Sequence, residues 1–275
     1  MKRKPPLPRL NFALLTGLLL VLATVATTRA AADEELSSEE RGLQIAREAW
    51  EREAGYGDSA AELYMLLRAG GGQEAQRELR LRSLEVSESE TRALIIFDAP
   101  LDVRGTALLT HSFTDQEDNQ WLFLPAVGGE RRIAGGGRSG PFMGSEFAFE
   151  DLGVQRVEDF TYTYVGEDTL NDMACYVIER YPTDSASGYK RQVAWLDQEH
   201  YRVQKVDYYD RRDELLKTLT AEGYQQYEGQ YWRPKKMEMH NHQNGRSTTL
   251  EWKNISFDNG FTARMFDRNA IRSAR

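Results

Sequence analysis

Cysteine is almost absent from this chain, which has a single cysteine, Cys175, among 275 residues. One cysteine cannot form an internal disulfide, so the apolar core must hold the fold without the cross-links on which many small exported domains rely. Cys175 lies in the strand-like run 174–178. Its position predicts a buried, small apolar side chain rather than a reactive thiol.

Long hydrophobic runs are also scarce, and the only one covers residues 12–26. It follows a basic start and precedes the small residues 30–32, the pattern of a secretory signal peptide. At about 15 residues it is shorter than the roughly 20 that a membrane-spanning helix needs. We therefore predict a signal peptide over 1–32, cleaved after Ala30 or Ala32, and one soluble domain over 33–275. Because Cys175 is far from this cleavage site, an N-terminal lipid anchor is excluded.

Basic residues are outnumbered, with 35 lysines and arginines against 43 acidic residues. Removal of residues 1–32 would take away five basic residues and no acidic ones, which changes the formal net charge from −8 to −13. An acidic surface of this kind argues against nucleic-acid binding, because such binding depends on cationic side chains that neutralise phosphates. It also disfavours adsorption to anionic lipid headgroups.

Residue patterns typical of catalysis are lacking as well. The chain has four histidines, of which His240 and His242 share one face of a predicted strand with Glu238. No fixed further ligand is near them, so two solvated side chains are favoured over a metal site. The sequence contains no Gly-x-Ser-x-Gly elbow for a nucleophilic serine. We therefore predict neither enzymatic activity nor a cofactor, and keep an envelope lipid or glycan hydrolase as an unsupported alternative.

The glycine-rich run 135–140 lacks the surroundings of a phosphate-binding loop. Such a loop needs a preceding strand, a following helix and a lysine in the right order. A mobile loop is the favoured interpretation of this run. It lies within the long interruption 128–151, and loops of this length in a compact domain are usually functional or flexible.

One amphipathic helix is expected near the start of the mature chain, over residues 37–53. Ser37 and Glu40 have the spacing of a capping box. Apolar residues then recur at helical spacing and give the helix one apolar face.

Short strands predominate after residue 57. About eleven of them, with mostly local connections, predict an antiparallel sheet rather than alternating strands and helices. Asn244 and Gly245 signal a tight hairpin near the end of the chain. The expected strands fall at 61–68, 79–84, 93–97, 106–113, 120–124, 160–164, 174–181, 189–196, 201–209, 215–221, 231–240 and 247–252.

A helix beside such a sheet must bury its apolar face. We expect a mainly β fold, in which the sheet curves and the helix lies across its concave side. Space left inside such a sheet would form an apolar cavity for a ligand. Phe142 and Met143, which have glycines nearby, are the candidates for a mobile apolar lid.

Several ordered segments closely resemble the LolA-like family of outer-membrane lipoprotein-sorting proteins. The similarity extends from about residue 41 to residue 266, and no single segment is specific by itself. The segments are 98–109 (DAPLDVRGTALL), 120–126 (QWLFLPA), 131–133 (RRI), 142–147 (FMGSEF), 150–152 (EDL), 188–190 (GYK), 195–197 (WLD), 217–219 (KTL) and 232–234 (WRP).

The resemblance implies a curved antiparallel half-barrel of about eleven strands, with helices covering its concave face. It also implies a Gram-negative periplasm and a role in moving lipids or lipoproteins between membranes. A longer branch of the family is associated with inner-membrane transporters of the resistance-nodulation-division (RND) type. The family supplies no catalytic residues. The receptor member of the superfamily carries a lipid anchor, and since this chain lacks the necessary cysteine, a shuttle is favoured over a receptor.

The combined prediction is a monomeric periplasmic carrier that binds acyl chains in an apolar cavity. The main alternative is a non-carrying accessory subunit of an RND-type transporter. The residues predicted to form the cavity wall and the lid are Trp121, Leu122, Leu124, Phe142, Met143, Phe147 and Tyr162.

Overall fold

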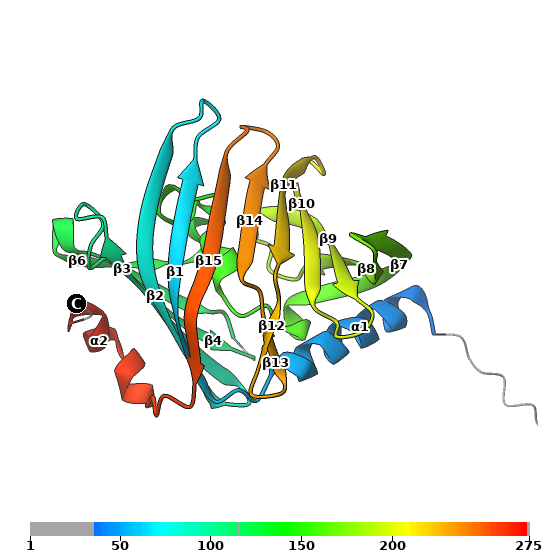
Figure 1. The fold of residues 1–275 in the computed structure, drawn as a ribbon, viewed down its shortest axis with the longest axis horizontal. Coiled ribbons are helices and arrows are strands. Elements are labelled where there is room, and N and C mark those ends of the chain that lie inside the picture. Colours follow the sequence, from blue (N-terminus) through cyan, green and yellow to red (C-terminus); the bar gives the residue numbers. More distant parts are fainter. Residues whose placement is uncertain (1–35, 115, 274–275) are drawn as a thin grey trace, which may run out of the picture. The chain divides into compact units, whose positions relative to one another are not determined.

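The computed structural model describes residues 36–114 and 116–273 of the chain, and Figure 1 shows their fold. The predicted signal peptide and its cleavage site lie outside the described residues. No helix in the described part is both long enough and apolar enough to cross a membrane.

Most of the chain forms one curved antiparallel sheet of thirteen strands. Its edge strands, β6 and β7, are not paired with each other, so the sheet is an open half-barrel as predicted. The strands, in their order across the sheet, are β6 (Gly129–Ile133), β5 (Asn119–Leu124), β4 (Ala107–Phe113), β3 (Glu90–Ala99), β2 (Glu74–Ser87), β1 (Asp58–Arg68), β15 (Ser247–Phe257), β14 (Lys236–Asn241), β11 (Leu215–Glu222), β10 (Val203–Asp210), β9 (Tyr189–Asp197), β8 (Met173–Pro182) and β7 (Phe160–Leu170).

The strands differ from the prediction at β6, at the expected strand 231–240 and at the short strand β12 (Gln225–Tyr227), which was not predicted. The short edge strand β6 was missed because the sequence around it reads as a glycine-rich loop. The expected strand at 231–240 is divided into β13 (Tyr231–Arg233) and β14, with Pro234 between them. Proline has no amide hydrogen to donate to a neighbouring strand, so the pairing breaks there. β13 pairs instead with β12 in a separate two-stranded sheet.

Helix α1 (Ser38–Glu53) confirms the helix predicted from the capping box. The amide of Glu40 donates to the hydroxyl of Ser37 at 3.2 Å, and the amide of Ser37 donates to the Glu40 carboxylate at 2.9 Å. The helix packs on the sheet beside β7. Gly42 permits this approach, since a Cβ at that position would lie 2.9 Å from the backbone of Thr163 and Tyr164. We call the face of the sheet that α1 covers the inner face.

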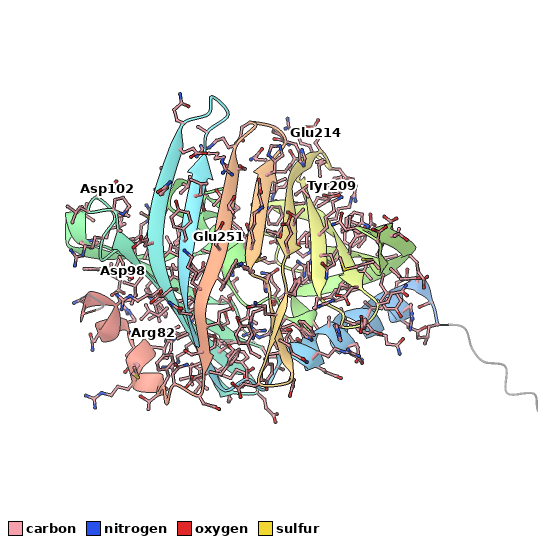
Figure 2. All side chains as sticks on the ribbon, in the orientation of Figure 1. Arg82, Asp98, Asp102, Tyr209, Glu214 and Glu251 are labelled. Carbon is pink, nitrogen blue, oxygen red and sulfur yellow. The ribbon has the colours of Figure 1, made fainter. Side chains whose placement is uncertain are left out.

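Side chains alternate between the inner and the outer face along each strand. Most of the outer face carries polar and charged groups, among them Arg82, Asp98 and Glu251 (Figure 2). Arg80 holds Asp98 there through two hydrogen bonds of 2.7 Å.

Over β3, β4 and β5, however, the outer face is apolar and covered. The C-terminal segment, residues 261–273, lies against it and contains the 3-10 helix η6 (Ala263–Phe266) and helix α2 (Arg268–Ser273). Phe266 and Ile271 are both 0% exposed. The second helix of the fold therefore covers the outer face, whereas helices had been expected only on the concave face.

The hairpin signal at Asn244-Gly245 is confirmed, because these residues lie in the turn between β14 and β15. The turn is longer than two residues: the amide of Asn241 bonds the carbonyl of Arg246 at 2.8 Å, so residues 242–245 form the loop.

The long interruption predicted at 128–151 contains β6 and short 3-10 helices rather than irregular loop. We call residues 134–159, between β6 and β7, the insert. It contains η2 (Gly135–Ser139), η3 (Phe142–Gly144), η4 (Phe149–Leu152) and η5 (Val157–Asp159), and η1 (Pro125–Val127) precedes β6. The glycine-rich run expected to be a mobile loop thus forms η2.

Candidate ligand site on the inner face

Apolar side chains line the inner face from one end of the sheet to the other. They come from alternate positions of the strands, as half-buried β-strands require. Together with Ile45 and Ala46 of α1 they form the main core of the protein. The buried sheet residues of this core include Leu63, Met65, Leu79, Phe97, Leu108, Leu122, Ile178, Val206, Leu219, Met239 and Leu250.

Three phenylalanines of the insert, Phe142, Phe147 and Phe149, fill the space over this surface. Phe142 is 1% exposed, and its ring centroid lies 5.6 Å from that of Phe97 on β3 and 5.6 Å from that of Phe149. The inner face therefore has a continuous apolar surface, and the insert occupies it.

Backbone turns direct the insert inward. Met143 and Gly144 both have positive φ angles, 50° and 79°. The amide of Phe142 donates to the carbonyl of Phe147 at 2.7 Å, and the amide of Phe149 donates to the carbonyl of Gly140 at 3.1 Å. Phe142 was expected in a mobile lid, whereas the structure makes it a core residue. Met143 beside it is only partly buried against the same core.

Polar groups on the sheet hold the backbone of the insert. Arg246 donates to the carbonyl of Gly144 at 2.8 Å, and Arg77 donates to the carbonyl of Met143. The amide of Glu146 donates to the hydroxyl of Thr248 at 3.0 Å. These contacts come from β2, β15 and the turn before β15, so they bridge the insert to the middle of the sheet.

Charged side chains of the insert are held in the same way. Lys217 of β11 donates to the Asp151 carboxylate at 2.7 Å and to the carbonyl of Glu146 at 2.9 Å. Both side chains of the Lys217–Asp151 pair are about 5% exposed or less. Glu146 accepts from Asn241 at 2.8 Å and pairs with Arg246 at 3.0 Å.

Two tyrosines surround this ion pair. The Tyr189 hydroxyl donates to Asp151 at 2.9 Å, and the Lys217 ammonium lies 5.1 and 5.2 Å from the ring centroids of Tyr189 and Tyr208. Burial, and then the negative charge of Asp151, raise the pKa of both phenols, so both stay neutral. We call the contacts of Arg77, Lys217, Asn241, Arg246 and Thr248 with the insert the polar tether.

Six of the seven residues predicted to line the cavity belong to the inner core. Tyr162 of β7 is one of them, and burial raises the pKa of its phenol to about 12. Their role in ligand binding stays a prediction. The six are Leu122, Leu124, Phe142, Met143, Phe147 and Tyr162.

Trp121 lies on the opposite face of the sheet from these six. It packs against the outer cluster beneath the C-terminal segment, and its ring centroid lies 5.1 Å from that of His111. Strand alternation separates Trp121 from its neighbour Leu122, and the sequence alone could not decide which of the two points inward.

The polar tether was not predicted. One signal for it is present in the sequence, because Lys217 shares the inward side of β11 with Leu219 and Ala221. A lysine at a buried position needs a partner. The partner, Asp151, lies 66 residues away along the chain, and only the folded sheet brings the two together.

The other residues considered in the sequence lie away from the inner face. Cys175 is 0% exposed, as predicted, and burial raises the pKa of its thiol. His240 and His242 are exposed, with ring centroids 4.9 Å apart, and His242 shares a hydrogen bond of 2.8 Å with Thr218. The described part of the chain has no group of three or more side chains arranged to hold a metal ion.

Comparison with known proteins gives consistent relatives. A family model described as "-like: Uncharacterized protein" matches residues 89–273. A putative outer-membrane lipoprotein-sorting protein domain from Vibrio parahaemolyticus is 45% identical, with a TM-score of 0.83, over 85% of this chain and 99% of that one. A DUF1329 family protein from Desulfovibrio piger is 28% identical, with a TM-score of 0.82, over 86% of this chain and 100% of that one.

A more distant structure extends the likeness in fold alone. The LolA superfamily protein from Nitrosomonas europaea is 18% identical, with a TM-score of 0.67, over 86% of this chain and 100% of that one. No curated protein matches the sequence.

Proposed function

The chain belongs to the LolA-like family of outer-membrane lipoprotein-sorting proteins, and on this premise we propose that it is a periplasmic carrier of lipid or lipoprotein acyl chains. The acyl chain binds the inner face at the place that the insert occupies in this structure. The observation that carries the proposal is the apolar inner face filled by one separate segment, whose backbone is held to the sheet by polar contacts.

Exchange of the insert for a ligand is nearly balanced in free energy. Burial of three phenylalanine side chains contributes about 8 kcal/mol in total, at up to about 3 kcal/mol each. Burial of fourteen methylene groups contributes about 11 kcal/mol, at about 0.8 kcal/mol per group. A carrier that must later release its cargo needs a small difference of this kind, since a deep, empty apolar cavity would hold the chain too firmly.

The polar tether suits such an exchange. When the insert leaves, its Asp151 and Glu146 carboxylates and the half-exposed Arg246 side chain are hydrated by water. Lys217 stays on the inner face, where the polar head of an incoming lipid would replace Asp151 as its partner. The buried ion pair sets the closed position of the insert, because the Lys217 ammonium has its partners there at 2.7 and 2.9 Å.

A disulfide lock tests the proposal. The Glu146 amide and the Thr248 hydroxyl are 3.0 Å apart, so the double variant Glu146→Cys/Thr248→Cys puts one cysteine on the insert and one on β15 at a point where the two segments are in contact. Oxidation should fix the insert on the inner face and abolish binding of a fluorescent fatty acid, and reduction should restore it. The native Cys175 is fully buried and does not compete for the pairing.

Each single-cysteine variant is the matched control, because it removes the same native side chain and cannot form the lock. Undiminished fatty-acid binding by the oxidised double variant, with the disulfide verified by mass, would refute insert displacement. Native mass spectrometry of protein taken from periplasm without detergent, followed by lipid analysis of the extract, then identifies the cargo.

A second candidate function is favoured by the same filled inner face. A non-carrying accessory subunit of an inner-membrane RND-type transporter would keep the insert in place permanently. Its test is affinity purification of the wild-type protein from cells. The accessory role is supported over the carrier if a transporter co-purifies with the protein and the protein has a lipid-free mass. The same role predicts that the double variant takes up no fatty acid even after its disulfide is reduced.

A further inference from the structure

A polar cavity of about 490 Å³ lies beside the insert. Its walls come from the β4–β5 loop, the insert, the start of β7 and the β8–β9 loop. The insert thus has two sides: phenylalanines face the core, while Glu150, Asp151 and Asp159 border this cavity.

Acidic side chains dominate the lining, and most of the cationic groups nearby are already paired. Arg138 is ion-paired with Asp184, and Lys217 with Asp151. Glu150 accepts hydrogen bonds only from neutral groups, the Ser187 hydroxyl at 2.7 Å and the Gly188 amide at 2.9 Å. Burial raises the pKa of the Glu150 carboxyl, which shows that its negative charge is poorly compensated.

Asp159 and Asp118 add two more partly buried carboxyls to the cavity wall. Burial raises the pKa of both carboxyls, although Arg156 lies 3.5 Å from Asp118 and its own amide donates to Asp159. Arg156 itself is not part of the cavity wall. The chain approaches these carboxylates through Gly153, where a Cβ would lie 2.8 Å from the Asp118 carboxylate.

The side-chain oxygen of Gln120 is an independent sign of a ligand. Gln120 borders the cavity and is 1% exposed. Its amide nitrogen donates to the carbonyl of Phe149 at 2.9 Å, and because a carbonyl can only accept, this contact fixes the orientation of the amide. The opposite atom, Oε1, is buried and has no hydrogen-bond donor among the described residues. A buried acceptor without a donor costs free energy that a donating ligand would recover.

We propose that this cavity binds an organic cation through a primary ammonium group, which donates to a carboxylate of the wall, Glu150 or Asp159, and to the Gln120 side-chain oxygen. A metal ion does not fit, because the carboxylates of the described residues do not converge as metal ligands. An ammonium group has three donors and needs fewer carboxylates around it than a metal ion does. The carbon chain that carries it lies against Phe160, Pro182 and Tyr189 of the lining.

The ammonium can belong to a free polyamine or to an aminolipid headgroup, and two arms of one titration distinguish these sources. Isothermal titration calorimetry at about 0.15 M salt, where long-range attraction to the acidic surface is screened, measures putrescine binding directly. A second arm compares lysophosphatidylethanolamine with lysophosphatidylglycerol of the same chain length, which lacks the ammonium group.

Glu150→Gln and Asp159→Asn should each weaken binding of the preferred amine at least tenfold. Both variants should keep unfolding midpoints close to that of the wild type. Glu88→Gln, at the exposed β2–β3 turn, makes the same change in net charge and should leave binding unchanged. Two variants at different wall positions ensure that loss of folding in one still leaves a test.

Saturable putrescine binding identifies a free amine as a ligand, and a preference for the ethanolamine lipid that is lost in Glu150→Gln identifies a headgroup. Absence of both effects, or equal weakening by Glu88→Gln, overturns the proposal. The carrier function is judged separately. If both lysolipids bind equally well and putrescine does not bind, the cation site is refuted and the carrier function is supported. If putrescine binds and neither lysolipid does, the cation site is supported and the carrier function is refuted.

Discussion

The strands β3, β4 and β5 are covered on both faces by segments outside the sheet, and the two covers are built differently. On the outer face, the C-terminal segment buries Phe266 and Ile271 fully, and its ion pairs, Arg92 with Asp267 and Arg268 with Glu130, each include an exposed side chain. On the inner face, the insert combines buried phenylalanines with a polar tether of charged side chains and backbone carbonyls. Removal of a cover without a replacement exposes the apolar side chains beneath it to water, which costs free energy. A cover that sits on a ligand-sized apolar surface through polar contacts can be exchanged for a ligand.

The largest expected effects come from Phe142→Ala and Phe266→Ala, which truncate one buried ring on each face. Each should lower the free energy of unfolding by about 4 kcal/mol, through lost burial and the cavity left behind. Urea denaturation measures both losses. Added palmitate should then restore much of the stability of Phe142→Ala and little of that of Phe266→Ala, because only the inner cavity joins the proposed acyl site. Equal rescue of both variants, or of neither, would contradict a functional difference between the two covers.

Lys217→Met tests the contribution of the polar tether to the same comparison. It leaves the Asp151 carboxylate buried without a cationic partner, held only by the neutral donors Tyr189 and the Ala148 amide, and should destabilise the protein by about 3 kcal/mol. Hydrogen exchange should accelerate in the insert and stay unchanged in residues 261–273.

The double variant Lys217→Met/Asp151→Leu removes both charges and should recover much of that stability, since an apolar pair of similar volume often replaces a buried ion pair without loss. Unchanged exchange in the insert of Lys217→Met would mean that the ion pair does not set its position.

Smaller effects are expected from replacing the arginine that donates a hydrogen bond to each cover. Arg246→Gln removes a donor to the carbonyl of Gly144, and Arg92→Gln removes a donor to the carbonyl of Ala263. Each should cost about 1 kcal/mol, the usual size for one hydrogen bond. Site-resolved hydrogen exchange should show faster exchange in the insert for the first variant and in the C-terminal segment for the second. Exchange that rises in both segments for either variant would show that the covers are coupled.

The sheet and its main helix were predictable from the sequence because their signals are local. The capping box of Ser37 and Glu40 fixes the start of α1, and alternating apolar residues identify most of the strands. Where local signals conflict, the prediction was wrong: Pro234 divides an apparent strand, and glycines conceal β6. The apolar face of the helix predicted a curved sheet, and the family resemblance agreed with it and specified a half-barrel.

The site was predictable only in its apolar half. Alternation could not decide whether Trp121 or Leu122 faces inward, so one of the two had to be misplaced, and it was Trp121. Phe142 and Phe147 were among the predicted site residues and Phe149 was not, and Phe142 was expected in a mobile lid because nearby glycines suggest flexibility. Lys217 and Asp151 meet across 66 residues of sequence, and no local pattern encodes a contact of that range.

The smallest expected effect is a pH dependence of the outer cover alone. Burial lowers the pKa of His111, whose ring nitrogen is 2.7 Å from the carbonyl of Phe266. Because the folded-state pKa lies below the usual value of about 6.5, the unfolded chain binds the proton more readily. The contribution of His111 is therefore complete above about pH 6.5 and is lost as the pH falls towards the lowered folded-state pKa. Hydrogen exchange in residues 261–273 should accelerate over this window, and His111→Gln should remove the acceleration. If the same acceleration persisted in His111→Gln, another group would control the outer cover.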